Sequence, residues 1–163
     1  MNLRGYATAT RIDGYIRTYG GQKVTGTRPN RRAIVLVDDE PNILRALRRE
    51  LLFALGSKGV TVLTARSGQE CLAILADQHD SVTLVISDFR MPEMTGGELV
   101  ERVSTTYPDI ALMLLTAYSD SAELTPGASA VLSGCLMKPW DVDDLVARIE
   151  TVLEPEEAIA RPA

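Results

Sequence analysis

The chain has 163 residues, of which 45% are apolar and 24% charged. This length suits one domain of ordinary size, and the composition excludes a wholly disordered, collagen-like or disulfide-stapled chain. The formal net charge of −5 is unevenly spread, because residues 1–32 carry seven basic side chains and one acid, while the remainder carries ten basic and 21 acidic groups. The body is therefore too acidic to attract nucleic acid through its overall field.

Cysteine usage and hydropathy bear on the cellular compartment. Cys71 and Cys135 lie in separate apolar stretches without the spacing of a metal site, which favours two reduced thiols. No apolar run approaches the roughly 18 residues of a membrane span, and the first residues do not lead into the apolar stretch of a secretory signal. The sequence predicts a cytoplasmic protein with no membrane span.

Residues 1–32 are rich in Gly, Thr, Arg and Tyr and show no sustained apolar period. We expect a basic N-terminal arm that is partly or wholly disordered, with at most a short helix around Arg11 to Tyr19. Its positive charge suits nucleic acid, lipid or an acidic partner face, and its role stays open. A domain over residues 33–153 and a C-terminal tail over residues 154–163 follow.

Five apolar runs bounded by turn residues predict the strands of the main domain. They are near-continuous rather than alternating, as expected of strands buried on both faces of a parallel sheet. The runs are Ala33–Val37, Val60–Ala65, Val82–Ser87, Ile110–Thr116 and Val131–Met137.

Segments with helical periodicity lie between these runs. A stripe formed by Leu44, Leu47, Leu51 and Leu55 predicts the first helix, with Gly56 as its stop. Further helices are predicted over Gly68–Asp77, Gly97–Thr106 and Val142–Leu153. The fourth connection contains Pro126, which predicts a short or irregular element there. This alternation of strands and helices predicts an α/β, doubly wound architecture.

Charged or hydroxyl groups stand at four of the five predicted strand exits. Asp38 and Asp39 follow the first strand, Asp88 follows the third, Thr116 ends the fourth and Lys138 follows the fifth. Any one acid at such a place is commonly just a turn residue. Because sites in open parallel sheets form at the carboxyl ends of the strands, the convergence of all these groups favours a functional site.

The chemistry of this cluster points to a metal and a phosphoryl group. Three carboxylates brought together repel one another unless a cation intervenes, and Mg²⁺ with several retained waters suits oxygen ligands. The metal and the Lys138 ammonium would balance the three acids and receive the negative oxygens of a phosphoryl group. One carboxylate would then be the nucleophile, since carboxylates form acyl phosphates.

Four segments resemble, in order and spacing, the receiver domain of bacterial two-component response regulators of the CheY-like kind. They are Ile34–Pro41, Leu84–Gly96, Leu114–Tyr118 and Leu136–Trp140, which read IVLVDDEP, LVISDFRMPEMTG, LLTAY and LMKPW. The resemblance covers about residues 33–153. It implies a flavodoxin-like, doubly wound five-stranded parallel sheet of order 2-1-3-4-5 with helices on both faces.

The resemblance also implies a role for each site residue. Asp88 would be the phosphoacceptor, and Thr116 and Lys138 would contact the phosphoryl group. The Mg²⁺ ligands would be Asp38, Asp39, Asp88 and the backbone carbonyl of Arg90. The Lys138–Pro139 peptide bond would be cis.

Two positions depart from the receiver pattern. Cys135 stands three positions before the lysine, where receivers often carry an aromatic residue that turns inward, so an aromatic switch is not expected. Thr95 replaces the usual Asp of the Met-Pro-x-Met-Asp-Gly turn, a mild change. The side chains of Arg90 and Tyr118, two positions after Asp88 and Thr116, are either plain surface or groups that tune the lifetime of the phosphoryl group.

By resemblance the protein is a stand-alone response regulator. It would accept a phosphoryl group from a sensor histidine kinase or a phosphotransfer protein, and signal through partner binding at the face of the fourth strand, fifth strand and last helix. It would assist its own phosphorylation and dephosphorylation rather than act as an enzyme on another substrate. No DNA-binding domain is expected, whereas the downstream target and a homodimer stay open.

Three other functions are alternatives to this one. A receiver-like interaction module that signals without phosphorylation stays open as the alternative. A phosphatase of the haloacid-dehalogenase type is disfavoured because Arg90 stands where that chemistry wants a second acid. Nucleotide binding is disfavoured because the first strand leads into acids and a proline rather than a glycine-rich loop.

Overall fold

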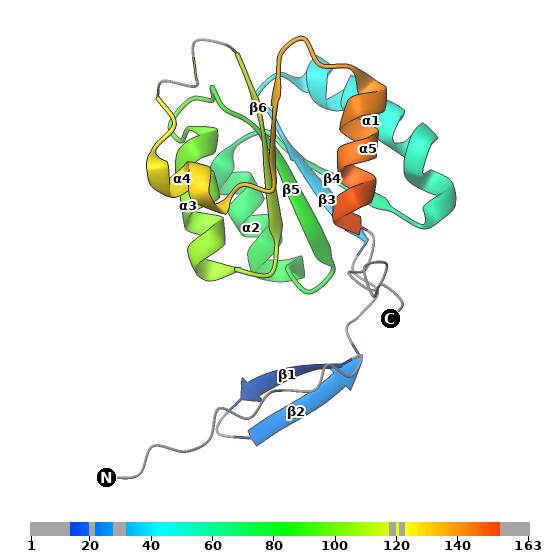
Figure 1. Cartoon of the computed structure of the whole chain (residues 1–163), viewed down its shortest axis with the longest axis vertical. Helices are drawn as coiled ribbons and strands as arrows, with labels where there is room; N and C mark the ends of the chain where they lie inside the picture. The colour runs from blue at the N-terminus through cyan, green and yellow to red at the C-terminus, as the bar shows by residue number, and fades with distance from the viewer. Residues whose placement is uncertain (1–13, 20–21, 28–31, 118–119, 121–122, 154–163) are drawn as a thin grey trace, which may run out of the picture. The chain divides into compact units, whose positions relative to one another are not determined.

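The computed structural model describes residues 14–19, 22–27, 32–117, 120 and 123–153. The chain divides into two compact units, Met1–Asn30 and Arg31–Ala163 (Figure 1). None of the described helices is both long and apolar enough to cross a lipid bilayer.

The described residues of the first unit form an antiparallel pair of strands. Strand β1 (Gly14–Tyr19) pairs with strand β2 (Gln22–Thr27), with Ile16 opposite Thr25. The helix expected around Arg11 to Tyr19 is therefore wrong for the residues that are described, because Tyr, Ile and Thr prefer extended backbone over helix. The remainder of the predicted arm lies outside the described residues, and its disorder stays a prediction.

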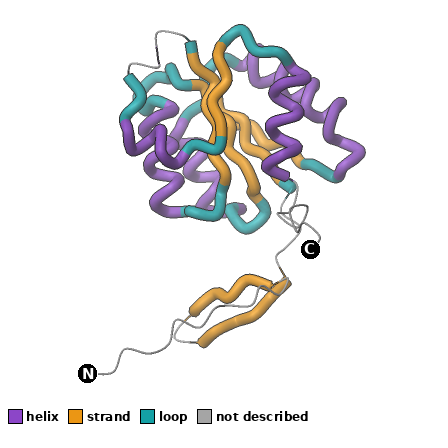
Figure 2. The backbone as a smooth tube through the Cα atoms, viewed as in Figure 1, coloured by secondary structure: helices purple, strands orange, loops and turns teal. Residues whose placement is uncertain are grey.

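The second unit contains a five-stranded parallel sheet. Its strands are β3 (Ala33–Val37), β4 (Thr61–Ala65), β5 (Val82–Asp88), β6 (Ala111–Thr116) and β7 (Gly134–Met137). The spatial order is β4-β3-β5-β6-β7, with every neighbouring pair parallel. Figure 2 shows the strands of this unit in orange between the purple helices. Counted within this unit the order is 2-1-3-4-5, so the predicted fold class and topology are confirmed.

Helices cover both faces of this sheet, as Figure 1 shows. They are α1 (Pro41–Leu55), α2 (Gly68–Gln78), α3 (Gly96–Thr106), α4 (Pro126–Val131) and α5 (Val142–Leu153). Residues of α1 and α5 pack with one set of strand side chains, and residues of α2, α3 and α4 pack with the other. The second unit is thus a three-layered sandwich in which the sheet is the middle layer.

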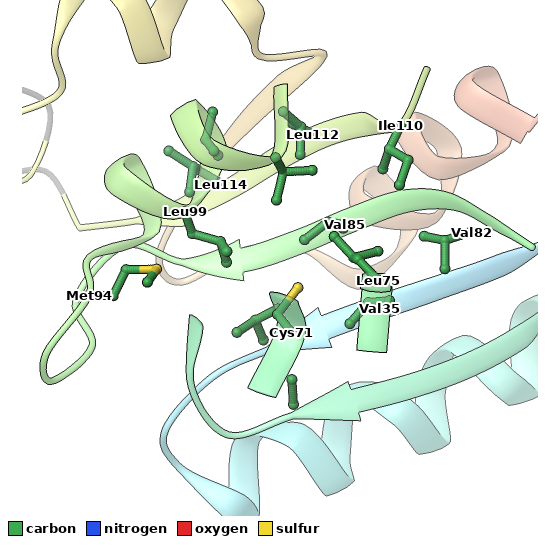
Figure 3. Packing of buried hydrophobic residues seen from close by; sticks show 14 of the residues in the cluster. Val35, Cys71, Leu75, Val82, Val85, Met94, Leu99, Ile110, Leu112 and Leu114 are labelled. Carbon is green, nitrogen blue, oxygen red and sulfur yellow. The ribbon is translucent and has the colours of Figure 1, made fainter. Parts of the chain in front are cut away.

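Alternation along the strands divides the core into these two layers. Val35 of β3 packs against α2 and α3, together with Leu112 and Leu114 of β6. Ile34 and Leu36, whose side chains point to the opposite face of β3, pack against α1 and α5. Figure 3 shows Val35 and Cys71 gathered in the first layer. Both faces of each central strand are buried, which explains the near-continuous apolar runs in the sequence.

The predicted element boundaries agree with the observed ones to within one residue, except at the start of the last strand. Gly56 caps α1 as predicted, and its right-handed backbone leads into a 3₁₀ turn, η1 (Gly56–Lys58). The reversal comes at Gly59, whose φ of 71° lies in the left-handed region that glycine favours. Val131 ends α4 instead of opening the last strand, which begins only at Gly134.

The predicted short fourth helix is confirmed, and the proline has a local role in it. Pro126 occupies the first turn of α4, where its missing N–H costs no helical hydrogen bond. The side chain of Thr125 accepts a hydrogen bond from the Ala128 N–H and so caps the same turn. Pro126 therefore helps to begin this helix rather than to break it.

Candidate functional site

The carboxyl edge of the sheet brings the predicted acidic residues together. Asp38 directly follows β3, and Asp88 is the last residue of β5. Carboxylate oxygens of Asp38, Asp39 and Asp88 lie within 4.8 Å of one another. Asp38 and Asp88 are only 2% and 6% exposed, so their charges are poorly shielded by water.

Asp38 has a buried carboxylate oxygen whose negative charge is not compensated by a hydrogen bond among the described residues. Its Oδ1 accepts a hydrogen bond from the Glu40 N–H at 2.8 Å. Its Oδ2 is buried and, among the described residues, has no hydrogen-bond partner. Burial, joined by the negative charges of Asp88 and Asp39, raises the pKa of this carboxyl, although the bond from Glu40 and the charge of Lys138 oppose the rise.

These features fit a hard divalent cation. An orphaned carboxylate oxygen beside two further carboxylates is the donor set that Mg²⁺ prefers, with water filling the remaining positions. Asp38, Asp39 and Asp88 would hold the ion, which would supply positive charge for phosphoryl oxygens. Arg90 follows Asp88 by two residues, and its backbone carbonyl stays a predicted ligand.

Lys138 reaches the same cluster from the end of β7. Its Nζ lies 2.5 Å from Asp88 Oδ1. Burial acts to lower the pKa of Lys138, but the hydrogen bond to Asp88 and the charges of Asp88, Asp38 and Glu40 outweigh it, so the pKa is raised. The Lys138–Pro139 bond is cis, as expected. The ammonium group is thus held charged against the predicted phosphoacceptor.

Thr116 lies at the same edge, between the acidic cluster and the last strand. It is 4% exposed, and its carbonyl accepts a hydrogen bond from the Lys138 N–H at 2.7 Å. Its Oγ1 lies 3.5 Å from Sγ of Cys135. Cys135 is exposed, and it occupies the position where receivers often carry an aromatic residue.

A close backbone contact holds the end of β5 in place. A Cβ built on Gly96 would lie 2.2 Å from the Asp88 carbonyl oxygen, so only glycine fits there. The neighbouring Thr95 begins α3 with a capping box, in which its side chain accepts from the Glu98 N–H and the Glu98 carboxylate accepts from the Thr95 N–H. Thr95 therefore serves this turn well despite its departure from the receiver pattern.

Arg90 turns out to be part of an ion-pair cluster that the sequence analysis missed. Its Nε lies 2.6 Å from Asp120 Oδ1, and its Nη2 lies 2.6 Å from Glu123 Oε1. The hydrogen bonds to Glu123 and Asp120 raise the pKa of the guanidinium. Asp120 is 2% exposed, and its Oδ2 accepts a hydrogen bond from the Ala117 N–H at 2.6 Å.

The signal that could have revealed this cluster was weak. Asp120 stands in a polar stretch without periodicity, where an acid is usually read as a turn residue. Only its opposite charge to Arg90 hinted at a pairing. Tyr118, the other residue thought to tune the site, lies outside the described residues.

Comparisons with known proteins agree with this fold. A family model for the response regulator receiver domain matches residues 34–150. The chain is 36% identical over 121 residues to the transcriptional regulatory protein GlrR of Escherichia coli, and the match covers 74% of this chain but only 26% of GlrR. The chain thus spans about a quarter of that relative.

Solved structures of receiver domains superpose on the same part of the chain. A response regulator receiver domain protein from Clostridium thermocellum has a TM-score of 0.66 and 28% identity, with 78% of this chain and 98% of that one covered. The response regulator protein TrrA of Thermotoga maritima, solved in complex with Mg²⁺–BeF, has a TM-score of 0.62 and 30% identity, with 74% and 98% covered. The chain belongs to the response regulator receiver domain family.

Proposed function

We propose that this receiver domain accepts a phosphoryl group on Asp88 in a Mg²⁺-dependent reaction, with a histidine kinase or a phosphotransfer protein as donor. The observation that carries the proposal is that Asp88 lies close to groups of both charges. Its carboxylate lies within 4.8 Å of the carboxylates of Asp38 and Asp39, and the Lys138 ammonium is 2.5 Å from its Oδ1. This arrangement suits a nucleophilic carboxylate that must receive a negatively charged group.

Each neighbouring residue has a definite part in this reaction. A carboxylate oxygen of Asp88 forms a bond to phosphorus as the bond from phosphorus to the donor breaks. Bound Mg²⁺ would supply positive charge for the phosphoryl oxygens. Lys138 would move its ammonium from the carboxylate to a phosphoryl oxygen, and the Thr116 hydroxyl would donate a hydrogen bond to another.

The proposed output is a change in partner binding at the face formed by β6, β7 and α5. Thr116 and Lys138 stand at the ends of β6 and β7, so both groups that contact the phosphoryl group also belong to this face. On β7, Met137 is exposed at 51% and Cys135 is exposed too, on either side of the buried Leu136. Apolar side chains left open beside the site are suited to contact with a partner.

The relatives support this assignment. Sensor kinase CckA of Brucella abortus is 33% identical over 124 residues, which cover 76% of this chain and 13% of that protein. A kinase and the transcriptional regulator GlrR thus both contain a stretch similar to this domain, as a module of phosphoryl-based signalling would require. The complex of TrrA with Mg²⁺–BeF makes beryllofluoride a suitable mimic of the phosphoryl group here.

The test is labelling by acetyl phosphate, followed by intact mass or by phosphate-affinity electrophoresis. The wild-type protein should gain one phosphoryl group in Mg²⁺ and none in EDTA. Asp88→Asn should abolish labelling because the amide cannot act as the nucleophile. Asp77→Asn, which alters an exposed acid of α2, is the matched control and should label normally.

Two results would contradict the proposal. Undiminished labelling of Asp88→Asn would remove Asp88 as the acceptor. A wild-type protein that is folded in Mg²⁺ but takes up neither acetyl phosphate nor beryllofluoride would favour an interaction module that works without phosphorylation. The Asp39→Asn variant adds a check on the metal, since it should need more Mg²⁺ than the wild type for the same labelling.

A further inference from the structure

One carboxylate joins the two loops that flank the candidate site. Asp120 Oδ1 accepts a hydrogen bond from Arg90, which lies two residues after Asp88. Asp120 Oδ2 accepts a hydrogen bond from the N–H of Ala117, the residue that follows Thr116. Both distances are 2.6 Å. The backbone at the end of β6 is therefore linked through one side chain to the loop that follows β5.

The burial of Asp120 makes this link costly to break. Asp120 is 2% exposed, whereas the Glu123 side chain, which shares the Arg90 guanidinium, is 55% exposed. Hydrogen bonds with an ionised partner are stronger than neutral ones, and a buried carboxylate that loses a donor is not readily compensated by water. Asp120 is thus the main anchor of the cluster, and Glu123 is its solvent-exposed member.

The link bears on Thr116 because Asp120 binds the N–H of the residue that follows Thr116. In this structure the Thr116 hydroxyl contacts Cys135 Sγ at 3.5 Å. A charged phosphoryl oxygen on Asp88 would be a stronger acceptor for the Thr116 hydroxyl than the Cys135 sulfur. Because Ala117 is the next residue, a shift of the Thr116 backbone toward Asp88 would strain the bond from the Ala117 N–H to Asp120.

We propose that Asp120 is a positioning residue that holds Thr116 and Ala117 in the conformation of the unphosphorylated domain and so lowers the affinity of the site for a phosphoryl group. This inference rests on the proposed function of Asp88. Asp120 itself would touch neither the phosphoryl group nor the metal. It acts through the backbone of Ala117, and Arg90 holds it in place.

The experiment is a titration of beryllofluoride at saturating Mg²⁺, followed by the fluorescence of Trp140. Trp140 is the only tryptophan of the chain, and its ring centroid lies 5.9 Å from Lys138 Nζ, so it reports on the lysine that meets the mimic. Asp120→Asn keeps the shape of the side chain but weakens both bonds. We expect it to bind beryllofluoride about fivefold more tightly, the factor that one net hydrogen bond corresponds to.

Variants of the two other members separate this positioning effect from a simple change of charge. Arg90→Gln leaves the backbone carbonyl of Arg90 in place but releases Asp120, so it should tighten binding too, by about twofold. A pure charge effect predicts the reverse, because the loss of a positive group weakens an anion site. Glu123→Gln should change the affinity by less than about twofold, as expected of an exposed ion-pair partner.

The double variant completes the test. Asp120→Asn combined with Arg90→Gln should bind no more tightly than Asp120→Asn alone, since both changes act through one link. Affinity that is unchanged or weaker in Asp120→Asn, or weaker in Arg90→Gln, would overturn the inference while leaving Asp88 as the acceptor. Failure of the wild-type protein to respond to beryllofluoride would overturn the inference together with the proposed function.

Discussion

Cys71 and Cys135 are both free thiols, but the fold gives them opposite surroundings. Cys71 lies on the inner face of α2 within the core, and burial, with a smaller effect of Glu70, raises its pKa to about 12. Cys135 lies on the edge strand β7 and is exposed. Since the thiolate is the reactive form, the two residues should differ in alkylation even at mildly alkaline pH.

We therefore predict that iodoacetamide at pH 8 adds one group to the folded protein, at Cys135, and a second only after denaturation. Peptide mass mapping locates the modification. Cys135→Ser should remove the fast reaction and leave Cys71 untouched until the protein unfolds. Rapid double modification under native conditions would show that α2 opens readily from the sheet.

The residues of the site divide into those that sequence can predict and those that it cannot. Asp38, Asp88 and Lys138 could be found because each follows an apolar run, and the ends of parallel strands share one edge of the sheet. Asp120 follows no such run. Its role depends on the path of the chain after β6 and on the reach of the Arg90 side chain, and neither is visible in a local pattern.

At the scale of elements, the start of α3 is the most sensitive junction with the site. Gly96→Ala would place a methyl group 2.2 Å from the Asp88 carbonyl and 2.9 Å from the Leu114 side chain. Because the first of these is backbone, relief requires the end of β5 or the start of α3 to move. We predict a loss of about 3 kcal/mol in the free energy of unfolding, measured by urea denaturation.

A glycine without such a contact provides the control. Gly56 has right-handed helical backbone, and a Cβ built there meets nothing within 4 Å. Gly56→Ala should leave stability unchanged or raise it by about 0.5 kcal/mol, because the unfolded chain loses conformational freedom. If both alanine variants were equally stable, the close approach at Gly96 would not constrain the site.

The boundaries that sequence predicts well or badly have local physical causes. Gly56 caps α1 where the apolar stripe ends, whereas the chain reverses only at Gly59, where the backbone turns left-handed. Val131 was assigned to a strand because it continues an apolar run, yet it is 40% exposed at the end of α4. An apolar run indicates which residues are buried, but it does not by itself decide whether they form a helix or a strand.

At the scale of the whole molecule, the second unit contains both layers of the core. All residues of the two buried clusters lie between Ala33 and Leu153. We therefore predict that deletion of residues 1–30 leaves the thermal midpoint and the labelling of Asp88 unchanged, as measured by circular dichroism and acetyl phosphate. Deletion of residues 1–36 removes most of β3 and should abolish folding.

A marked loss of thermal stability in the shorter deletion would show that the basic unit contributes to the stability of the domain. That outcome would contradict the prediction that residues 33–153 form a domain by themselves. Retained folding after the longer deletion would contradict the central place of β3, which pairs with both β4 and β5.

The placement of the site at four separate strand ends has a consequence for how the protein is made. The acidic pair that follows β3 leaves the ribosome first, Asp88 follows much later, and Lys138 comes after nearly the whole domain. A nascent chain that ends before β7 carries the three carboxylates without their ammonium partner. The complete site that the proposed phosphorylation of Asp88 needs would therefore arise only in the step that adds the last strand to the sheet.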